Sequence, residues 1–169
     1  MRFSLAVFLP LAMFTVTLFA ADPVPVEKLL PLLPPAPKGW KADKPGTQAG
    51  ESEGKKMTRV EMNYSETLES SSGFATIEIK DWNSDREMLK RLEESWKRKD
   101  DIRPSSYSKV VTIGGFLGRE ESQGSIQTHT LRVVVAERYL VIVSVQNIPV
   151  ELFPEWTKLV DWKKLSELQ

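Results

Sequence analysis

The chain has 169 residues, with 23 Lys and Arg against 23 Asp and Glu, one His and no Cys. This balanced charge offers no field that would attract nucleic acid or an anionic membrane, so neither is expected as a partner. The absence of Cys and of a second His excludes disulfides, zinc sites of the usual composition and Cys–His nucleophiles. A chain of this length buries about 68–70% of its unfolded surface, which is enough for one hydrophobic core.

The N-terminal segment has the features of an export signal. Arg2 precedes an uncharged apolar run over residues 3–19, and Ala20 and Ala21 follow it. This order predicts a signal peptide over residues 1–21, so the protein is expected to be exported, either periplasmic or secreted. Cleavage after Ala20 or Ala21 would place Leu18 or Phe19 two positions before the cleaved Ala, where a small residue is usual. An uncleaved N-terminal anchor is therefore the alternative. No later segment is long enough to span a bilayer, so no membrane span is expected after cleavage.

Residues 22–39 are rich in proline, which forbids a long helix. The segment carries more apolar side chains than a free linker would: Leu29, Leu30, Leu32 and Leu33. We therefore expect a Pro-rich N-terminal strap that lies along the surface of the domain. The alternative is a Pro-rich segment that binds a partner.

Residues 40–169 are predicted to form a single α+β domain. Trp40 stands at its start and is expected to dock its indole into the edge of the core. Residues 41–56 combine several glycines with polar side chains and contain no large apolar residue. This composition predicts a mobile loop, with a ligand lid as the alternative.

Two segments, residues 58–64 and 74–80, alternate between apolar and polar side chains. This period predicts two strands, each with one polar face. If they pair as an antiparallel hairpin, a register that sets Arg59 opposite Glu78 keeps the apolar sets together and places opposite charges side by side. The polar face is predicted to be solvated. The candidate interaction surface consists of Arg59, Glu61, Glu78, Lys80 and Trp40.

The period changes to that of a helix over residues 84–98. Ser84 and Glu87 have the spacing of a capping box, and apolar residues then recur at helical spacing from Met88 to Trp96. Acidic residues precede basic ones by four positions on the opposite face, which favours an exposed helix.

Four further segments, residues 108–113, 116–122, 126–136 and 139–146, predict strands that are joined by short connections. Such connections are too short for parallel crossovers, so the sheet is expected to be mainly antiparallel. The last two strands are rich in Val and Ile on both faces, which predicts central strands covered on both sides.

Residues 151–168 carry apolar groups at helical spacing and predict one C-terminal helix, with a break near Asp161 as the alternative. Pro154 is expected in the first turn, where its missing N–H costs least. Together the patterns predict an α+β fold with a mainly antiparallel sheet of about six strands and a helix on each face, which is an α/β/α sandwich.

Few residues of the sequence have the chemistry of a catalytic or metal-binding site. His129, the single imidazole, is in phase with apolar neighbours on its strand and is expected to be partly buried and hydrogen-bonded. A hydrolytic site would combine it with Ser122, Ser125 or Ser144, but no Ser occupies a Gly-x-Ser-x-Gly elbow. Residues 114–118 (Gly-Gly-Phe-Leu-Gly) predict a turn and not a phosphate loop. No calcium-binding loop is present, so no catalytic residue, metal ligand or cofactor is predicted.

The order of these segments resembles a known group of proteins. A Leu-Pro-Pro-Ala-Pro-Lys-Gly-Trp segment at residues 33–40, the Gly-Gly-Phe-Leu-Gly turn and an Arg-Tyr-Leu-Val-Ile-Val hairpin at residues 138–143 are similar to exported bacterial proteins of uncharacterised families with a Mog1/PsbP-like α/β/α sandwich. The resemblance covers residues 33–168. It implies an antiparallel sheet between helices and a role as an accessory or binding module for larger assemblies. The photosystem members bind calcium or chloride through their own residues, and no position here corresponds to those ligands.

The sequence contains the patterns of a packed core but no catalytic motif. This favours a non-catalytic, exported accessory domain that binds a protein or an envelope component. It would use residues 41–56, the Pro-rich strap or the charged sheet face. A small-molecule carrier is the first alternative. It would need a cavity of about 300 Å3 or more between the sheet and the C-terminal helix, lined by Trp156, Trp162 or Trp40. A hydrolase centred on His129 is the second alternative.

Overall fold

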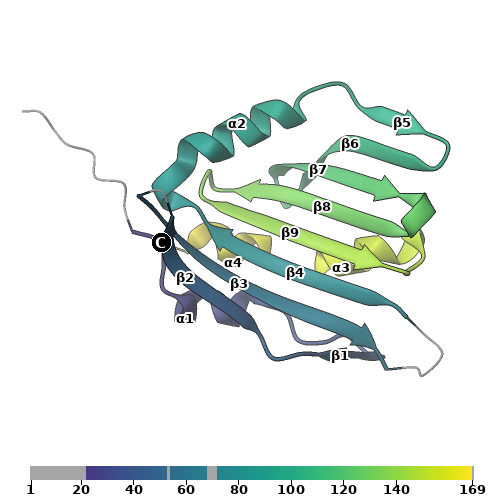
Figure 1. Ribbon diagram of the computed structural model, residues 1–169, viewed down its shortest axis with the longest axis horizontal. Helices are drawn as coiled ribbons and strands as arrows, with labels where there is room; N and C mark the ends of the chain where they lie inside the picture. The colour runs from purple at the N-terminus through teal and green to yellow at the C-terminus, as the bar shows by residue number, and fades with distance from the viewer. Residues whose placement is uncertain (1–21, 53, 68–71, 169) are drawn as a thin grey trace, which may run out of the picture.

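One antiparallel sheet of nine strands runs through the described residues, 22–52, 54–67 and 72–168, of the computed structural model (Figure 1). The strands are β1 (Trp40–Ala42), β2 (Gly46–Ser52), β3 (Lys55–Glu66), β4 (Phe74–Asp81), β5 (Asp101–Arg103), β6 (Ser106–Ile113), β7 (Phe116–Gln123), β8 (Thr128–Val135) and β9 (Tyr139–Gln146). The helices are α1 (Val26–Leu29), η1 (Leu30–Leu32), η2 (Asn83–Asp85), α2 (Arg86–Trp96), η3 (Gly124–Ile126), η4 (Val150–Leu152), α3 (Phe153–Lys158) and α4 (Trp162–Glu167). The predicted signal peptide lies outside the described residues.

The order across the sheet is β1-β3-β4-β9-β8-β7-β6-β5, and β2 also pairs with β3. β1 pairs with the end of β3, where Trp40 faces Glu66, and β2 pairs with its beginning, where Gly46 faces Glu61. The prediction of a mobile loop over residues 41–56 is therefore wrong. The side chains of this edge are mostly exposed, so the segment shows no apolar alternation, and its backbone hydrogen bonds to β3 hold it in place.

The centre of the sheet consists of β4, β9 and β8, and one face of these strands carries the main hydrophobic core. Ile77, Val143 and Val133 lie on this face and have no exposed surface. The N-terminal segment, α3 and α4 cover the same face, behind the sheet in Figure 1. In the described part of the chain, no helix has the length and apolar character needed to cross a membrane.

The Pro-rich N-terminal segment is fixed to the sheet by both apolar and polar contacts. Leu29 and Leu33 are buried in the core. The hydroxyl of Tyr64 donates a hydrogen bond of 2.7 Å to the carbonyl oxygen of Pro34. The segment therefore belongs to the packed structure and does not hang free of it.

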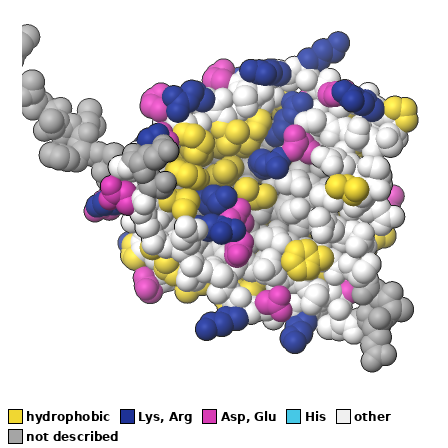
Figure 2. All heavy atoms as spheres, in the orientation of Figure 1, with side chains coloured by type: hydrophobic (Ala, Val, Ile, Leu, Met, Phe, Trp, Pro, Cys, Tyr) yellow, Lys and Arg dark blue, Asp and Glu magenta, His cyan; other side chains and the backbone are white. Residues whose placement is uncertain are grey.

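The opposite face of the sheet is only partly covered. Leu89 and Trp96 of α2 pack there against Val134 and Leu140 in a second, smaller cluster. Figure 2 shows an apolar patch beside α2 and, next to it, charged and other polar side chains that face solvent. A single helix therefore covers one part of this face.

The predicted fold class is wrong in its strand count and in its helical layers. The structure has nine strands and only a few short helices, and it is not a six-stranded sandwich with a helix on each face. The short edge strands β1, β2 and β5 lack apolar alternation, so the pattern could not reveal them. The C-terminal helix is divided into η4, α3 and α4, because Asp161 caps a new helix by accepting a hydrogen bond of 2.9 Å from the backbone N–H of Lys164.

The N-terminal cap of α2 also differs from the prediction. Asp85 caps the helix by accepting a hydrogen bond of 3.2 Å from the backbone N–H of Met88. Ser84 instead donates its hydroxyl hydrogen to the carbonyl oxygen of Lys56. Two residues with capping-box spacing therefore need not form a capping box, because the hydroxyl of the first can bond to a carbonyl oxygen of a neighbouring strand instead.

Candidate functional site

The structure brings the four predicted charged residues together, although in a different register. Arg59 lies opposite Lys80 and Glu61 lies opposite Glu78, two residues away from the predicted pairing. Arg59 still contacts Glu78 diagonally on the neighbouring strand and Glu61 two residues along its own strand, and Lys80 Nζ lies 3.1 Å from an oxygen of Glu78. A shift of two residues preserves the apolar alternation, so the sequence pattern could not distinguish the two registers.

Trp40 does not join that charged group. It packs on the opposite face, where its ring lies 4.8 Å from that of Trp156 in an edge-to-face arrangement. Tyr64 contacts Trp156 from another side, with ring centroids 5.1 Å apart. Trp156 is buried, so these three rings pack against one another, whereas Trp162, the third Trp predicted for a cavity, lines a separate surface hollow of about 570 Å3.

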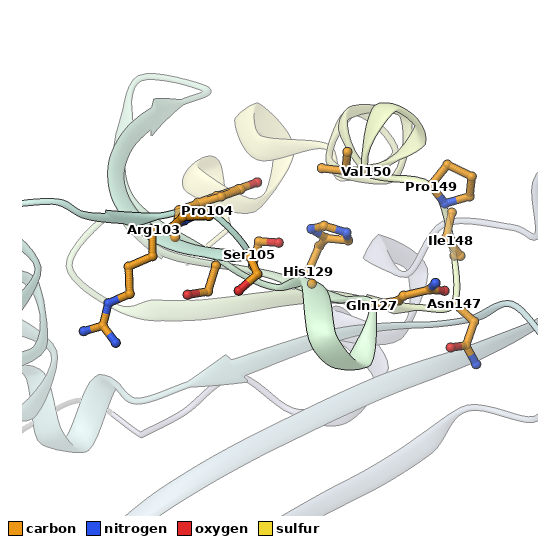
Figure 3. A pocket seen from close by; sticks show the side chains of 13 residues that line it. Arg103, Pro104, Ser105, Gln127, His129, Asn147, Ile148, Pro149 and Val150 are labelled. Carbon is orange, nitrogen blue, oxygen red and sulfur yellow. The ribbon is translucent and has the colours of Figure 1, made fainter.

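A pocket of about 540 Å3 opens instead at one end of the sheet (Figure 3). Its wall is formed by five segments: the turn between β5 and β6, the end of β7, η3, the start of β8, and the segment between β9 and η4. Its lining residues are Arg103, Pro104, Ser105, Ser106, Tyr107, Ser122, Gly124, Gln127, His129, Asn147, Ile148, Pro149 and Val150.

The strand register explains how His129 reaches this pocket. Ile102, Tyr107, Ser122 and His129 are paired in turn across β5, β6, β7 and β8, so all four side chains lie on one face. This is the face of the main core, and the imidazole lies against the ring of Phe153 with centroids 5.8 Å apart. The predicted phase of His129 with its apolar neighbours is confirmed.

Burial favours the uncharged form of the imidazole, and one of its nitrogens lacks a hydrogen-bond partner among the described residues. Burial lowers the pKa of His129 below its usual value, although the negative charges of Glu120 and Glu151 act in the opposite direction. Nδ1 is buried and has no hydrogen-bond partner among the described residues, so the expected bond to a neighbour is missing at this atom. Leaving a buried polar atom unsatisfied costs about 1–3 kcal/mol, and Trp82 Nε1 is the other side-chain atom of this kind among the described residues.

Arg103 and Glu120, two of the charged groups at the pocket, are paired with other side chains. Arg103 is the one charged residue of the lining, and its guanidinium binds both carboxylate oxygens of Asp101 at 3.0 and 2.7 Å. Next to the pocket, Glu120 accepts a hydrogen bond of 2.6 Å from the Tyr107 hydroxyl and lies 3.1 Å from Lys109 Nζ. The pocket lining therefore presents hydroxyl, amide and apolar groups with no unpaired charge, and Glu151, next to the lining residue Val150, adds a negative charge at its border.

A hydrolytic arrangement is not assembled here. Of the serines considered with His129, Ser122 is its direct neighbour, whereas Ser144 lies on the other face beside Thr130 and Ser125 is exposed in η3. No hydrogen bond joins Ser122 to Nδ1, and the His129 side chain is only 6% exposed. Within the described residues, no three acidic or imidazole side chains converge to hold a metal ion. The arrangement can bind a ligand, but it lacks a bonded nucleophile–base pair.

The pocket could not be predicted from the sequence, because its wall comes from five separate segments. Two of its residues, Gln127 and Asn147, adopt left-handed backbone conformations with φ of 46° and 54°. The backbone N–H of Asn147 donates a hydrogen bond of 3.0 Å to the carbonyl oxygen of Gln127, which joins these two turns. No local sequence pattern foretells this contact.

Fold and pocket together define an antiparallel β-sheet protein with a pocket at one end of the sheet. Comparisons with models of protein families, with curated proteins and with solved structures found no match. The resemblance to Mog1/PsbP-like proteins therefore stays a prediction.

Proposed function

We propose that this protein is an exported, non-catalytic binding domain that engages a partner protein through the end of the sheet that bears the His129 pocket. The observation that carries the proposal is the location of exposed apolar side chains. Five large apolar residues are exposed in the described part of the chain, and four of them lie on segments around the pocket: Ile102, Ile126, Val150 and Leu152. We call these four residues the apolar rim.

The apolar rim continues the pocket outward. Ile102 is 65% exposed, and it stands in the same row across the sheet as Tyr107 and His129. Exposed apolar side chains that gather around a pocket are characteristic of interaction sites, because contact with a partner removes their surface from water. Loops and turns that a rigid sheet holds in place are also common carriers of binding residues.

The charged sheet face offers less to a partner. Arg59, Lys80 and the two glutamates already neutralise one another, so a partner that bound there would have to replace existing ion pairs. A partner that binds the apolar rim does not have to replace ion pairs of this kind. The proposal therefore places the partner at the pocket end.

The test compares a rim variant with a matched control in a binding assay. The double variant Ile102→Ser/Val150→Ser removes two rim residues, and Phe74→Ser removes the fifth exposed apolar residue, which lies on the opposite face. A partner captured from envelope extracts with the wild-type protein is identified by mass spectrometry, purified and titrated against all three proteins. We expect the double variant to bind at least tenfold more weakly and Phe74→Ser to bind like the wild type. Equal binding by the double variant, or a selective loss with Phe74→Ser, would contradict the proposal.

Export is tested separately by fractionation and N-terminal sequencing of the protein from the native host. We expect the mature chain in the periplasmic or secreted fraction to begin at Ala21 or Asp22. A chain that retains Met1 in the cytoplasmic fraction would contradict export.

A further inference from the structure

We infer that the His129 pocket receives the side chain of a tyrosine from the partner protein, with the phenol hydroxyl hydrogen-bonded to the imidazole of His129. This inference rests on the proposed function, because it names the group that the proposed partner inserts. It combines four observations: the unsatisfied imidazole, the absence of free charge, the apolar wall and the exposed apolar rim.

The imidazole defines the polar contact. His129 lines the pocket, and its Nδ1 atom has no hydrogen-bond partner among the described residues; this atom has almost no accessible surface, so a ligand bonds to it only when the side chains that cover it move aside. A neutral imidazole has one donor nitrogen and one acceptor nitrogen, and a phenol hydroxyl can both donate and accept. A tyrosine hydroxyl can therefore bond to the ring in either tautomer.

The charge of the lining disfavours ionic ligands. Arg103 is its one charged residue, and a carboxylate or phosphate would have to compete with both oxygens of Asp101 for this guanidinium. A cationic ligand would need a free carboxylate, and no Asp or Glu lines the pocket. A neutral ligand loses the least hydration energy on entering such a site.

The shape and the apolar wall favour an aromatic ring. Figure 3 shows the imidazole of His129 standing in the middle of the pocket, with Val150, Pro149 and Ile148 on one side and Pro104 on the other. The volume of about 540 Å3 lies within the range of small-ligand pockets, roughly 300–1,000 Å3. Aromatic side chains combine a large apolar area with one polar atom, and Tyr is enriched among the residues that dominate binding interfaces.

The apolar rim decides between a protein and a sugar as the source of the ligand. Ser105, Ser106 and Gln127 could also bond to the hydroxyls of a neutral sugar. A sugar alone would leave the exposed Ile102 and Ile126 in water, whereas a protein surface around an inserted side chain would cover them. The partner's tyrosine is therefore favoured.

The experiment uses the fact that His129 is the only imidazole in the chain. The full mature protein, labelled with 15N-histidine, is titrated with N-acetyl-tyrosine amide, and both imidazole nitrogen shifts are followed by NMR. N-acetyl-phenylalanine amide is the matched probe without the hydroxyl, and acetate and N-acetylglucosamine test the other ligand classes. We expect saturable shifts with the tyrosine probe and an affinity about fivefold or more above that of the phenylalanine probe, as the loss of one hydrogen bond implies.

A variant tests whether the imidazole itself makes the contact. His129→Phe keeps a ring against Phe153 but removes both nitrogens, and the affinities of this variant are measured by fluorescence or calorimetry. We expect it to bind the tyrosine and phenylalanine probes equally weakly. If the variant does not fold, the wild-type comparison of the two probes still decides the question.

Three results would overturn the inference. They are an absence of imidazole shifts with the tyrosine probe, equal affinity of the wild type for both amino-acid probes, and stronger binding of acetate or N-acetylglucosamine. The titration contains no partner protein, so its outcome is independent of the capture assay. A failed capture with a positive titration would contradict the proposed partner protein. A positive capture with a failed titration would contradict the tyrosine as the group that enters the pocket.

Discussion

Asp81 is a fully buried carboxylate at the end of β4, and it ties three parts of the chain together. It accepts hydrogen bonds from the backbone N–H of Val24 at 2.7 Å and from that of Asn83 at 2.9 Å, and its ion pair with Arg138 measures 2.8 Å. Removing one partner of a buried pair leaves the other charge without compensation. We expect Asp81→Ala to lower the free energy of unfolding by about 3–5 kcal/mol in urea denaturation. Glu155→Ala, which breaks an exposed ion pair, is the control, with an expected change of about 0–1 kcal/mol.

His129 is the second residue whose environment has a measurable consequence. Because burial lowers the pKa of the folded imidazole, the unfolded chain takes up the proton first as the pH falls. The contribution of His129 to stability is therefore complete above the unfolded value, about 6.5, and is lost as the pH falls through the folded pKa. We expect the free energy of unfolding to decrease between pH 7.5 and 5.5, and His129→Phe to reduce that decrease. An unchanged pH dependence in the variant would show that carboxylates alone cause it.

At the scale of secondary structure, the close approach of β7 to β8 depends on Gly118. A Cβ atom added there would lie 2.8 Å from the carbonyl oxygen of Arg132, so a backbone atom would have to move. We expect Gly118→Ala to cost about 1–3 kcal/mol of unfolding free energy, as overpacking does in other cores. Gly50 in β2 provides the comparison, because a Cβ there meets nothing within 4 Å. Gly50→Ala should leave stability within about 0.5 kcal/mol, and similar losses for both variants would contradict this account.

The same scale shows which elements a single sequence can specify. The apolar period of residues 131–145 predicted the central β8–β9 hairpin, because buried strands need Val and Ile on both faces. β2 escaped prediction, since an exposed edge strand is held by its backbone and leaves no apolar signature. The helical period around Leu89 located α2, but Asp85 replaced Ser84 as its cap once a strand carbonyl bonded the serine hydroxyl.

At the scale of the whole molecule, the candidate binding end borders the core: Ile148 belongs to both, whereas Ile102 and Val150 are exposed. The core lies over the central strands. Its residues could be predicted from the sequence, because the buried side chains alternate with the other side chains along each strand. The pocket is made where five segments meet, and contacts of that kind depend on the complete topology. His129 was correctly placed on the apolar face, yet nothing in its neighbourhood along the chain indicated Val150 or Arg103 as companions in one pocket.

This difference in exposure predicts that stability and binding respond to different substitutions. Ile102 and Val150 are exposed, so replacing both with Ser removes little buried area, and we expect the free energy of unfolding to change by less than about 0.5 kcal/mol per site. Leu131 is 1% exposed in the core, and Leu131→Ala should cost about 2–5 kcal/mol. Urea denaturation of the two proteins, followed by tryptophan fluorescence, measures both quantities. If the rim double variant were destabilised as much as Leu131→Ala, the rim would be a part of the folded core, and the loss of partner binding could no longer be attributed to the surface. If it unfolds like the wild type, a loss of partner binding by the same variant can be attributed to the surface itself.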